Sequence, residues 1–187
     1  MSQPEFTSPA LSETVITELM VPSYTNFGGK IHGGVILSLM DKVAYVCASK
    51  HARAYCVTAS IDTVDFLESV EVGDLVSLKA SINYTGRSSM VVGIRVESEN
   101  VKKNIVKHTN TSYFTMVAKD EQHRSMQVPG LILDTEEQIR RFLEAIKRKE
   151  LKLAMKNETR QIKTSFSLPA AITLLQNERC MIIEKVQ

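Results

Sequence analysis

The sequence contains no tryptophan, and aromatic residues make up only 6% of its 187 residues. Proteins that bind single-stranded nucleic acids stack the bases on aromatic side chains, so this class of function fits the chain poorly. An excess of one charge is also missing, because 23 Lys and Arg stand against 21 Asp and Glu, a net charge of +2. Charge alone therefore does not indicate a nucleic-acid partner.

Cysteine is scarce, with only Cys47, Cys56 and Cys180, and none lies at a zinc or redox spacing. An odd, unpatterned set predicts no disulfide framework, so a reducing cytoplasm is the simplest location. The histidines have no ligand spacing with one another or with cysteine, and we expect no metal site.

Long apolar runs are absent too, since no segment approaches the roughly 18 uncharged apolar residues of a membrane span. The first twenty residues are acidic and polar where a signal peptide needs a basic start and an apolar core. What is present is 43% hydrophobic and 24% charged residues, which suits one packed domain with an appendage.

The N-terminal third predicts a strand, a loop and a helix. Residues 1–12 are rich in Ser, Pro and Thr and are expected to fray, and residues 13–20 alternate as a short strand does. Residues 22–34 hold four glycines in thirteen positions, which indicates a tight loop or a close backbone approach. Residues 35–50 favour helix and are apolar on nearly every side, which is typical of a helix that its neighbours bury.

The few polar positions of this helix share one face at helical spacing. They are Ser38, Asp41, Lys42, Tyr45 and Ser49. Strands then follow in succession over 54–67, 75–84, 90–100 and 105–119, with a turn at 70–74, and favour an antiparallel meander. One buried helix with several long strands predicts an α+β fold in which the sheet wraps the helix, and a second copy would cover the remaining face and edge.

The chain changes character after residue 120. Residues 120–130 read as a linker, and a helix follows at about 135–156, where Thr135 and Gln138 fit a capping box. The basic stretch 147–163 reads as a solvated amphipathic arm, and residues 167–176 as a short helix or strand. We therefore predict a flexible N-terminus over 1–12, a domain over 13–120 and a C-terminal helical extension over 121–187.

The stretch around the glycine loop has the residue types that thioester hydrolysis needs. Gly33 and Gly34 stand at the first turn of the helix, where unpaired N–H groups can polarise a carbonyl and no side chain blocks its approach. Asp41 shares a helix face with Gly34, about 10 Å further on at ~1.5 Å per residue, and is a candidate base or nucleophile. Asn26 in the loop can hold a water or the carbonyl.

Structural explanations remain open for each of these residues. Asp41 can be one carboxylate on a solvated face, Asn26 a turn residue, and the glycines a tight loop. His32, between them, can cap the helix or pack against it, or can act in catalysis.

Three blocks, at 21–41, 56–76 and 82–100, resemble the acyl-CoA thioesterases of the hotdog superfamily. They are similar to the bacterial short- and medium-chain acyl-CoA hydrolases and to the cytosolic brain-type long-chain enzyme. The helix after 128–130 resembles the segment that trails the domain in the brain-type enzyme. The resemblance covers roughly residues 13–120 and implies a single hotdog domain, in which a long central helix is wrapped by an antiparallel sheet.

The resemblance also implies roles and partners. Asp41 matches the catalytic carboxylate, Asn26 its partnering asparagine, and Gly33 or Gly34 the backbone donor. Arg87, Ser88 and Ser89 match positions near the CoA phosphates or pantetheine. The family's sites form between two protomers, so we expect an obligatory homodimer and a hexamer as a trimer of dimers, with CoA entering only as part of the substrate and no separate cofactor.

One departure concerns position 32, where many relatives have an aromatic residue and this chain has His32. The pattern there also resembles the phenylacetyl-CoA-type thioesterases, so the acyl preference stays open. Two other functions remain in view: a hotdog dehydratase that would use His32 with Asp41 as acid and base, and a non-catalytic acyl-CoA-binding regulator. No helix-turn-helix precedes the domain and the basic arm is a single helix, so we expect no nucleic-acid partner.

Overall fold

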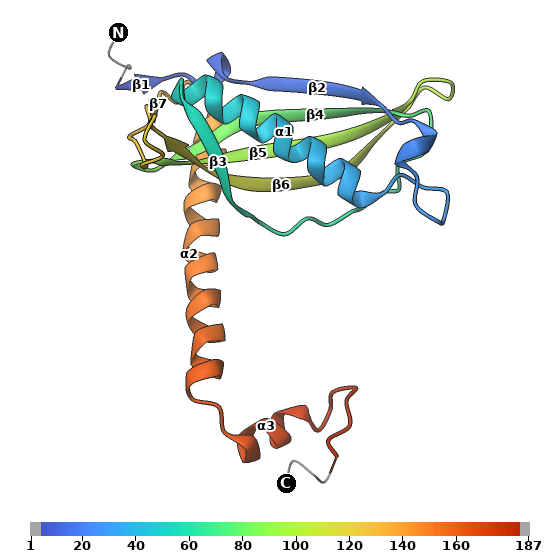
Figure 1. The fold of residues 1–187 in the computed structure, drawn as a ribbon, viewed down its shortest axis with the longest axis vertical. Helices are drawn as coiled ribbons and strands as arrows, with labels where there is room; N and C mark the ends of the chain where they lie inside the picture. Colours follow the sequence, from blue (N-terminus) through green and yellow to red (C-terminus); the bar gives the residue numbers. More distant parts are fainter. Residues whose placement is uncertain (1–4, 184–187) are drawn as a thin grey trace. The chain divides into compact units, whose positions relative to one another are not determined.

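The structure is a computed structural model that describes residues 5–183, and it divides into two compact units, residues 1–145 and 146–187. The first unit is built on one five-stranded antiparallel sheet and the helix α1 (Gly33–Ala52), which crosses one face of that sheet (Figure 1). The strands are β2 (Thr14–Leu19), β3 (Tyr55–Ile61), β4 (Leu75–Thr85), β5 (Ser89–Asn100) and β6 (Ile105–Lys119). The antiparallel sheet around a long helix confirms the expected α+β architecture.

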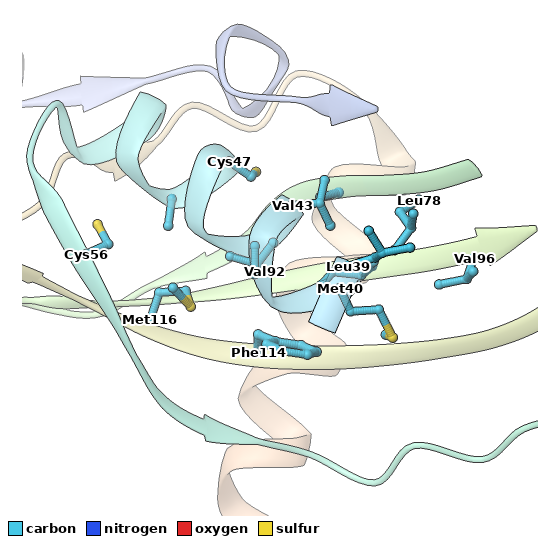
Figure 2. Packing of buried hydrophobic residues seen from close by; sticks show 14 of the residues in the cluster. Leu39, Met40, Val43, Cys47, Cys56, Leu78, Val92, Val96, Phe114 and Met116 are labelled. Carbon is cyan, nitrogen blue, oxygen red and sulfur yellow. The ribbon is translucent and has the colours of Figure 1, made fainter. Parts of the chain in front are cut away.

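The core lies between α1 and the concave face of the sheet (Figure 2). Helical spacing places Met40, Val43 and Cys47 on one side of α1, where each is fully buried. Val92 and Phe114, from β5 and β6, close the other side of this layer. The alternation along β4, β5 and β6 therefore has a simple cause, because every second residue faces α1.

The strand order is β2-β4-β5-β6-β3, and it corrects the expected simple meander. Only β4, β5 and β6 follow one another both in sequence and in space. The strand after α1 pairs with the last strand, with Tyr55 opposite Lys119, so it forms one edge of the sheet. It also ends at Ile61, earlier than the predicted 54–67, and residues 62–69 continue without regular structure.

The N-terminal segment differs from the fraying expected for residues 1–12. Strand β1 (Phe6–Thr7) pairs in parallel with β7 (Gly130–Leu131), and a 3₁₀ turn, η1 (Pro9–Leu11), follows it. Ser12 is buried and donates its hydroxyl to the carbonyl of Pro9. Local composition indicated disorder here, whereas the pairing partner lies more than a hundred residues further on in the sequence. Residues 1–4 lie outside the described residues.

Helix α2 (Glu136–Thr164) begins where the capping box predicted. Thr135 accepts a hydrogen bond from the Gln138 N–H at 3.2 Å, and the Gln138 side chain accepts one from the Asp134 N–H at 3.0 Å. The helix continues eight residues beyond the expected end at 156, and residues 168–175 form a further helix, α3 (Leu168–Leu175). Among residues 5–183 no helix is both long and apolar enough to cross a membrane.

Candidate active site

The glycine loop is held by the side chain and backbone of Asn26. The side-chain oxygen of Asn26 accepts hydrogen bonds from the N–H groups of Gly28 at 2.9 Å and Lys30 at 3.2 Å. The backbone N–H of Asn26 donates to the Lys30 carbonyl. Gly29 has a φ of 75°, in the left-handed region that glycine adopts without strain. Asn26 is thus a turn residue whose side-chain oxygen is used within the loop, whereas the amide NH₂ takes no part in these loop contacts.

His32 is the N-cap of α1. Its Nδ1 accepts a hydrogen bond from the Gly34 N–H at 2.9 Å, so the ring fills the place that a serine or aspartate side chain commonly takes. A Cβ at Gly34 would lie 2.9 Å from His32 Nδ1, so a glycine at this position leaves room for the capping ring. Because the Gly34 N–H is occupied by this cap, the open backbone donor at the start of the helix is Gly33.

The aromatic ring of Phe66 lies over Gly33. A Cβ at Gly33 would lie 3.2 Å from that ring, tighter than an ordinary contact, so a larger residue here would push the Phe66 ring outward even though Gly33 has an ordinary φ. The segment that holds Phe66 is tied down by Leu67 N–H to the Thr109 carbonyl and by Ile31 N–H to the Val70 carbonyl. Phe66 is itself half-exposed, so it forms a wall beside the Gly33 amide, a feature that the sequence analysis missed.

Asp41 is exposed on α1 and accepts a hydrogen bond from Thr58 on β3 at 2.6 Å. Thr58 faces the helix because Cys56, two residues earlier, faces the core. The register of β3 against β6 shifts between Thr58 and Ser60, which marks a bulge beside the contact. This short charge-assisted hydrogen bond holds the carboxylate, and no pattern in the sequence marked Thr58 for that role.

The same face of α1 forms a groove with β3. Asp41, Lys42, Tyr45 and Val46 line it from the helix, and Tyr55, Cys56, Val57 and Thr58 line it from the strand. Its volume is about 530 Å³. The rings of Tyr45 and Tyr55 lie 6.1 Å apart, so the polar face that the sequence predicted is also partly aromatic. Asp41 therefore lies at the wall of an open groove along an edge strand.

The three residues expected to contact CoA lie at the other end of the domain. Arg87 and Ser88 lie in the turn between β4 and β5, and Ser89 begins β5. The Arg87 carbonyl accepts from the Val128 N–H, and the neighbouring Pro129 carbonyl is hydrogen-bonded to His51 in the last turn of α1. Gly33 begins that helix, about 27 Å from its C-terminal end at ~1.5 Å per residue. One protomer thus does not bring this turn to Gly33.

Comparison with known proteins gives a consistent family. The profile described as "Thioesterase superfamily" matches residues 28–105. Protein VdlD of Helicobacter pylori is 43% identical over 75% of this chain and 80% of its own length. The uncharacterized acyl-CoA thioester hydrolase YkhA of Bacillus subtilis is 34% identical over 79% of this chain and 86% of its own.

Solved structures agree in fold. A hexameric acyl-CoA thioesterase matches with a TM-score of 0.79 and 39% identity, over 82% of this chain and 98% of its own. The acyl-CoA hydrolase of Staphylococcus aureus, solved with butyryl-CoA and CoA, matches with a TM-score of 0.76 and 31% identity, over 83% of this chain and 95% of its own length.

Further structures of the Staphylococcus aureus hydrolase carry alanine in place of an asparagine, an aspartate or a threonine. The intervals between those three positions equal the intervals from Asn26 to Asp41 and from Asp41 to Thr58. The fold, the relatives and the family profile agree, and the chain belongs to the hotdog-fold acyl-CoA thioesterase family.

Proposed function

We propose that this protein hydrolyses acyl-CoA thioesters to the free carboxylic acid and CoA. The observation that carries the proposal is the position of the Asp41 carboxylate. Asp41 lies on α1, the helix that begins at Gly33, and its carboxylate accepts a hydrogen bond from the Thr58 hydroxyl on β3. Gly33 and Asp41 are eight residues apart, about 12 Å along the axis at ~1.5 Å per residue. The Asp41 side chain leans toward the helix N-terminus, which shortens the gap to the size of a thioester and a water.

The Gly33 N–H is the donor for the thioester oxygen. As the carbonyl carbon is attacked, this oxygen gains negative charge, which the helix N-terminus and its unpaired amide stabilise. Asp41 acts as a base that takes a proton from the attacking water, or it attacks the carbonyl itself and the resulting anhydride is hydrolysed. In both routes the C–S bond breaks and the CoA sulfur leaves as a thiol after protonation. Asn26 orients the water or the carbonyl with its amide NH₂.

The arrangement of the site supports a dimer. Among the described strands, β3 pairs on one side only, with β6, so its outer edge is open to a second copy. Tyr45, Val46 and Tyr55 are exposed beside that edge, and Phe27 in the glycine loop is fully exposed. A two-fold pairing along β3 would cover these side chains and run the two α1 helices antiparallel. It would bring the 87–89 turn of one copy toward the Gly33 end of the other.

We extend this proposal to a hexamer of three such dimers in the cytoplasm. The support is that a solved relative at 39% identity is hexameric, and that a relative in mouse, 31% identical over 38% of its own length, is named a cytosolic acyl-CoA thioester hydrolase. Sedimentation of the purified protein tests the assembly. A sharp hexamer supports it, whereas a stable monomer would contradict both the hexamer and the dimer site.

The activity is tested by release of free CoA thiol from a panel of acyl-CoAs, short to long, with phenylacetyl-CoA included. We expect turnover of at least one acyl class, and the preferred acyl group then identifies the substrate range. The panel also includes crotonyl-CoA, for which the loss of ultraviolet absorbance of the conjugated double bond measures hydration. Hydration without thiol release, or no reaction with any thioester by a folded oligomer, would overturn the hydrolase proposal.

A further inference from the structure

The two units of the chain carry opposite charge. Residues 1–145 contain 14 Lys and Arg against 17 Asp and Glu, a net charge of −3. Residues 146–183 contain eight Lys and Arg against three Asp and Glu, a net charge of +5. The near neutrality of the whole chain therefore conceals a strongly basic C-terminal unit.

The second half of α2 carries an apolar row next to a basic row. Leu151, Met155 and Ile162 take the i, i+4 and i+11 positions of one helix face, where they are 58%, 65% and 69% exposed, and Glu158 takes the i+7 position of the same face. Each is followed directly by a lysine, so Lys152, Lys156 and Lys163 form a parallel row about 100° further round the helix. A helix with apolar and basic rows side by side is typical of segments that lie in a membrane–water interface.

An uncharged apolar segment follows the basic helix. No charged residue occurs over residues 164–177, which include α3. Phe166 and Leu174, at either end of this segment, are 65% and 80% exposed, and Met181 beyond it is 88% exposed. Figure 1 shows α3 following α2 at the C-terminal end of the chain. Moving such exposed, large apolar side chains out of water lowers the free energy of the system.

We propose that residues 146–183 dock the protein on an anionic lipid surface. The lysine row contacts the acidic headgroups, while Phe166, Leu174 and the apolar row of α2 enter the boundary between headgroups and acyl chains. A polyanion such as nucleic acid would satisfy the lysines but leave the apolar side chains in water. A lipid surface satisfies both, which is why the observations favour it. This inference concerns a surface outside the groove at Asp41 and does not depend on the proposed reaction.

The absence of tryptophan gives a direct test in the full chain. In Leu174→Trp the new residue is the sole tryptophan, so its emission reports the environment of α3 alone. On vesicles of phosphatidylcholine with one quarter phosphatidylglycerol, we expect its emission to shift to the blue and the protein to co-sediment. Pure phosphatidylcholine vesicles should give neither effect, and added salt should weaken binding to the anionic vesicles.

A matched pair of charge variants tests the lysine row. Lys156→Gln with Lys163→Gln should weaken binding to the anionic vesicles about 30-fold, since each surface lysine contributes ~1 kcal/mol and a tenfold change is about 1.36 kcal/mol. The control is Lys102→Gln with Lys103→Gln, which removes the same charge from the exposed β5–β6 turn of the first unit. The control should bind as the unchanged protein does. Thiol release from a short acyl-CoA should be the same in both.

Four results would overturn the proposal. They are no co-sedimentation with anionic vesicles, an equal loss in the two charge variants, an unshifted tryptophan on bound protein, and binding to duplex DNA or heparin in place of vesicles. A change of oligomeric state in Lys156→Gln with Lys163→Gln, without any vesicle binding by the unchanged protein, would instead assign the tail to contacts between copies of this chain.

Discussion

The hydrogen bond between Thr58 and Asp41 leads to a sharp prediction. Thr58→Val keeps the size and branching of the side chain and removes the hydroxyl that donates to the carboxylate at 2.6 Å. The position is exposed at the end of the groove, and the other contact of that hydroxyl is with the sulfur of Met116 at 3.4 Å, a weak acceptor. The substitution therefore acts mainly on how Asp41 is held.

The expected magnitude follows from the charge on the acceptor. A hydrogen bond to a charged group contributes about 1.5–3 kcal/mol, and about 1.36 kcal/mol corresponds to a tenfold change in rate. If the whole contribution is used to hold Asp41 in the transition state, kcat falls about 10- to 100-fold. Thiol release under saturating acyl-CoA measures kcat, and KM should change far less because Thr58 acts through Asp41.

Two controls make this prediction refutable. Thr58→Ser retains a hydroxyl and should recover most of the activity. Thr17→Val removes a strand hydroxyl that meets only the Ser77 hydroxyl at 3.0 Å on the exposed side of β2, and its kcat should stay within about twofold, as for most surface substitutions. A Thr58→Val variant that keeps full kcat in a folded oligomer would refute the role of this hydroxyl in holding Asp41. A Thr58→Ser variant as impaired as Thr58→Val would refute it too.

Three further predictions concern stability and reactivity. Gly34→Ala would place its Cβ 2.9 Å from His32 Nδ1 and displace the capping ring. Urea denaturation should then show a loss of about 1–2 kcal/mol, and an unchanged midpoint would reject the cap. Burial lowers the pKa of His51 below its usual 6.5, so the unfolded chain binds the extra proton first and stability declines as the pH falls through about 6.5. His51→Gln should remove that decline, and an unaltered pH profile would contradict this origin. Burial raises the pKa of the Cys47 thiol to about 12 and also raises the pKa of the buried Cys56 thiol, while Cys180 is exposed. Ellman's reagent should therefore label one of the three thiols rapidly in the native protein, and a fast second thiol would be inconsistent with this expectation.

Several elements could be predicted from the sequence because their signals are local. The apolar pattern of residues 35–50 predicts a buried helix, and Met40 and Val43 are indeed fully buried. Thr135 caps the helix as expected because the Gln138 N–H that it accepts from lies within one turn, while the Gln138 side chain accepts from the Asp134 N–H in place of the Thr135 N–H. Helix ends were less well predicted, since the last turns of α2 carry no strong stop signal before Thr164.

The features that the sequence did not predict depend on contacts between distant residues. The alternation of β3 indicates a strand but not its neighbour, so its place at the sheet edge, and hence the meeting of Thr58 with Asp41, required the tertiary structure. Phe66 reaches Gly33 through a segment without regular structure, which has no periodicity to interpret. The capping role of His32, one of those that the sequence left open, depends on one ring contact, the hydrogen bond that Nδ1 accepts from the Gly34 N–H.

The central claim is that Asp41 carries the hydrolysis of acyl-CoA. The most direct test compares Asp41→Asn with the unchanged protein in thiol release from the preferred acyl-CoA, with Cys180→Ser in both to remove the exposed protein thiol. Glu121→Gln, an exposed carboxylate in the 120–130 segment, serves as the matched control. The account predicts a loss of about 100-fold or more for Asp41→Asn alone, with the oligomer intact. Turnover by Asp41→Asn close to that of the control would contradict it.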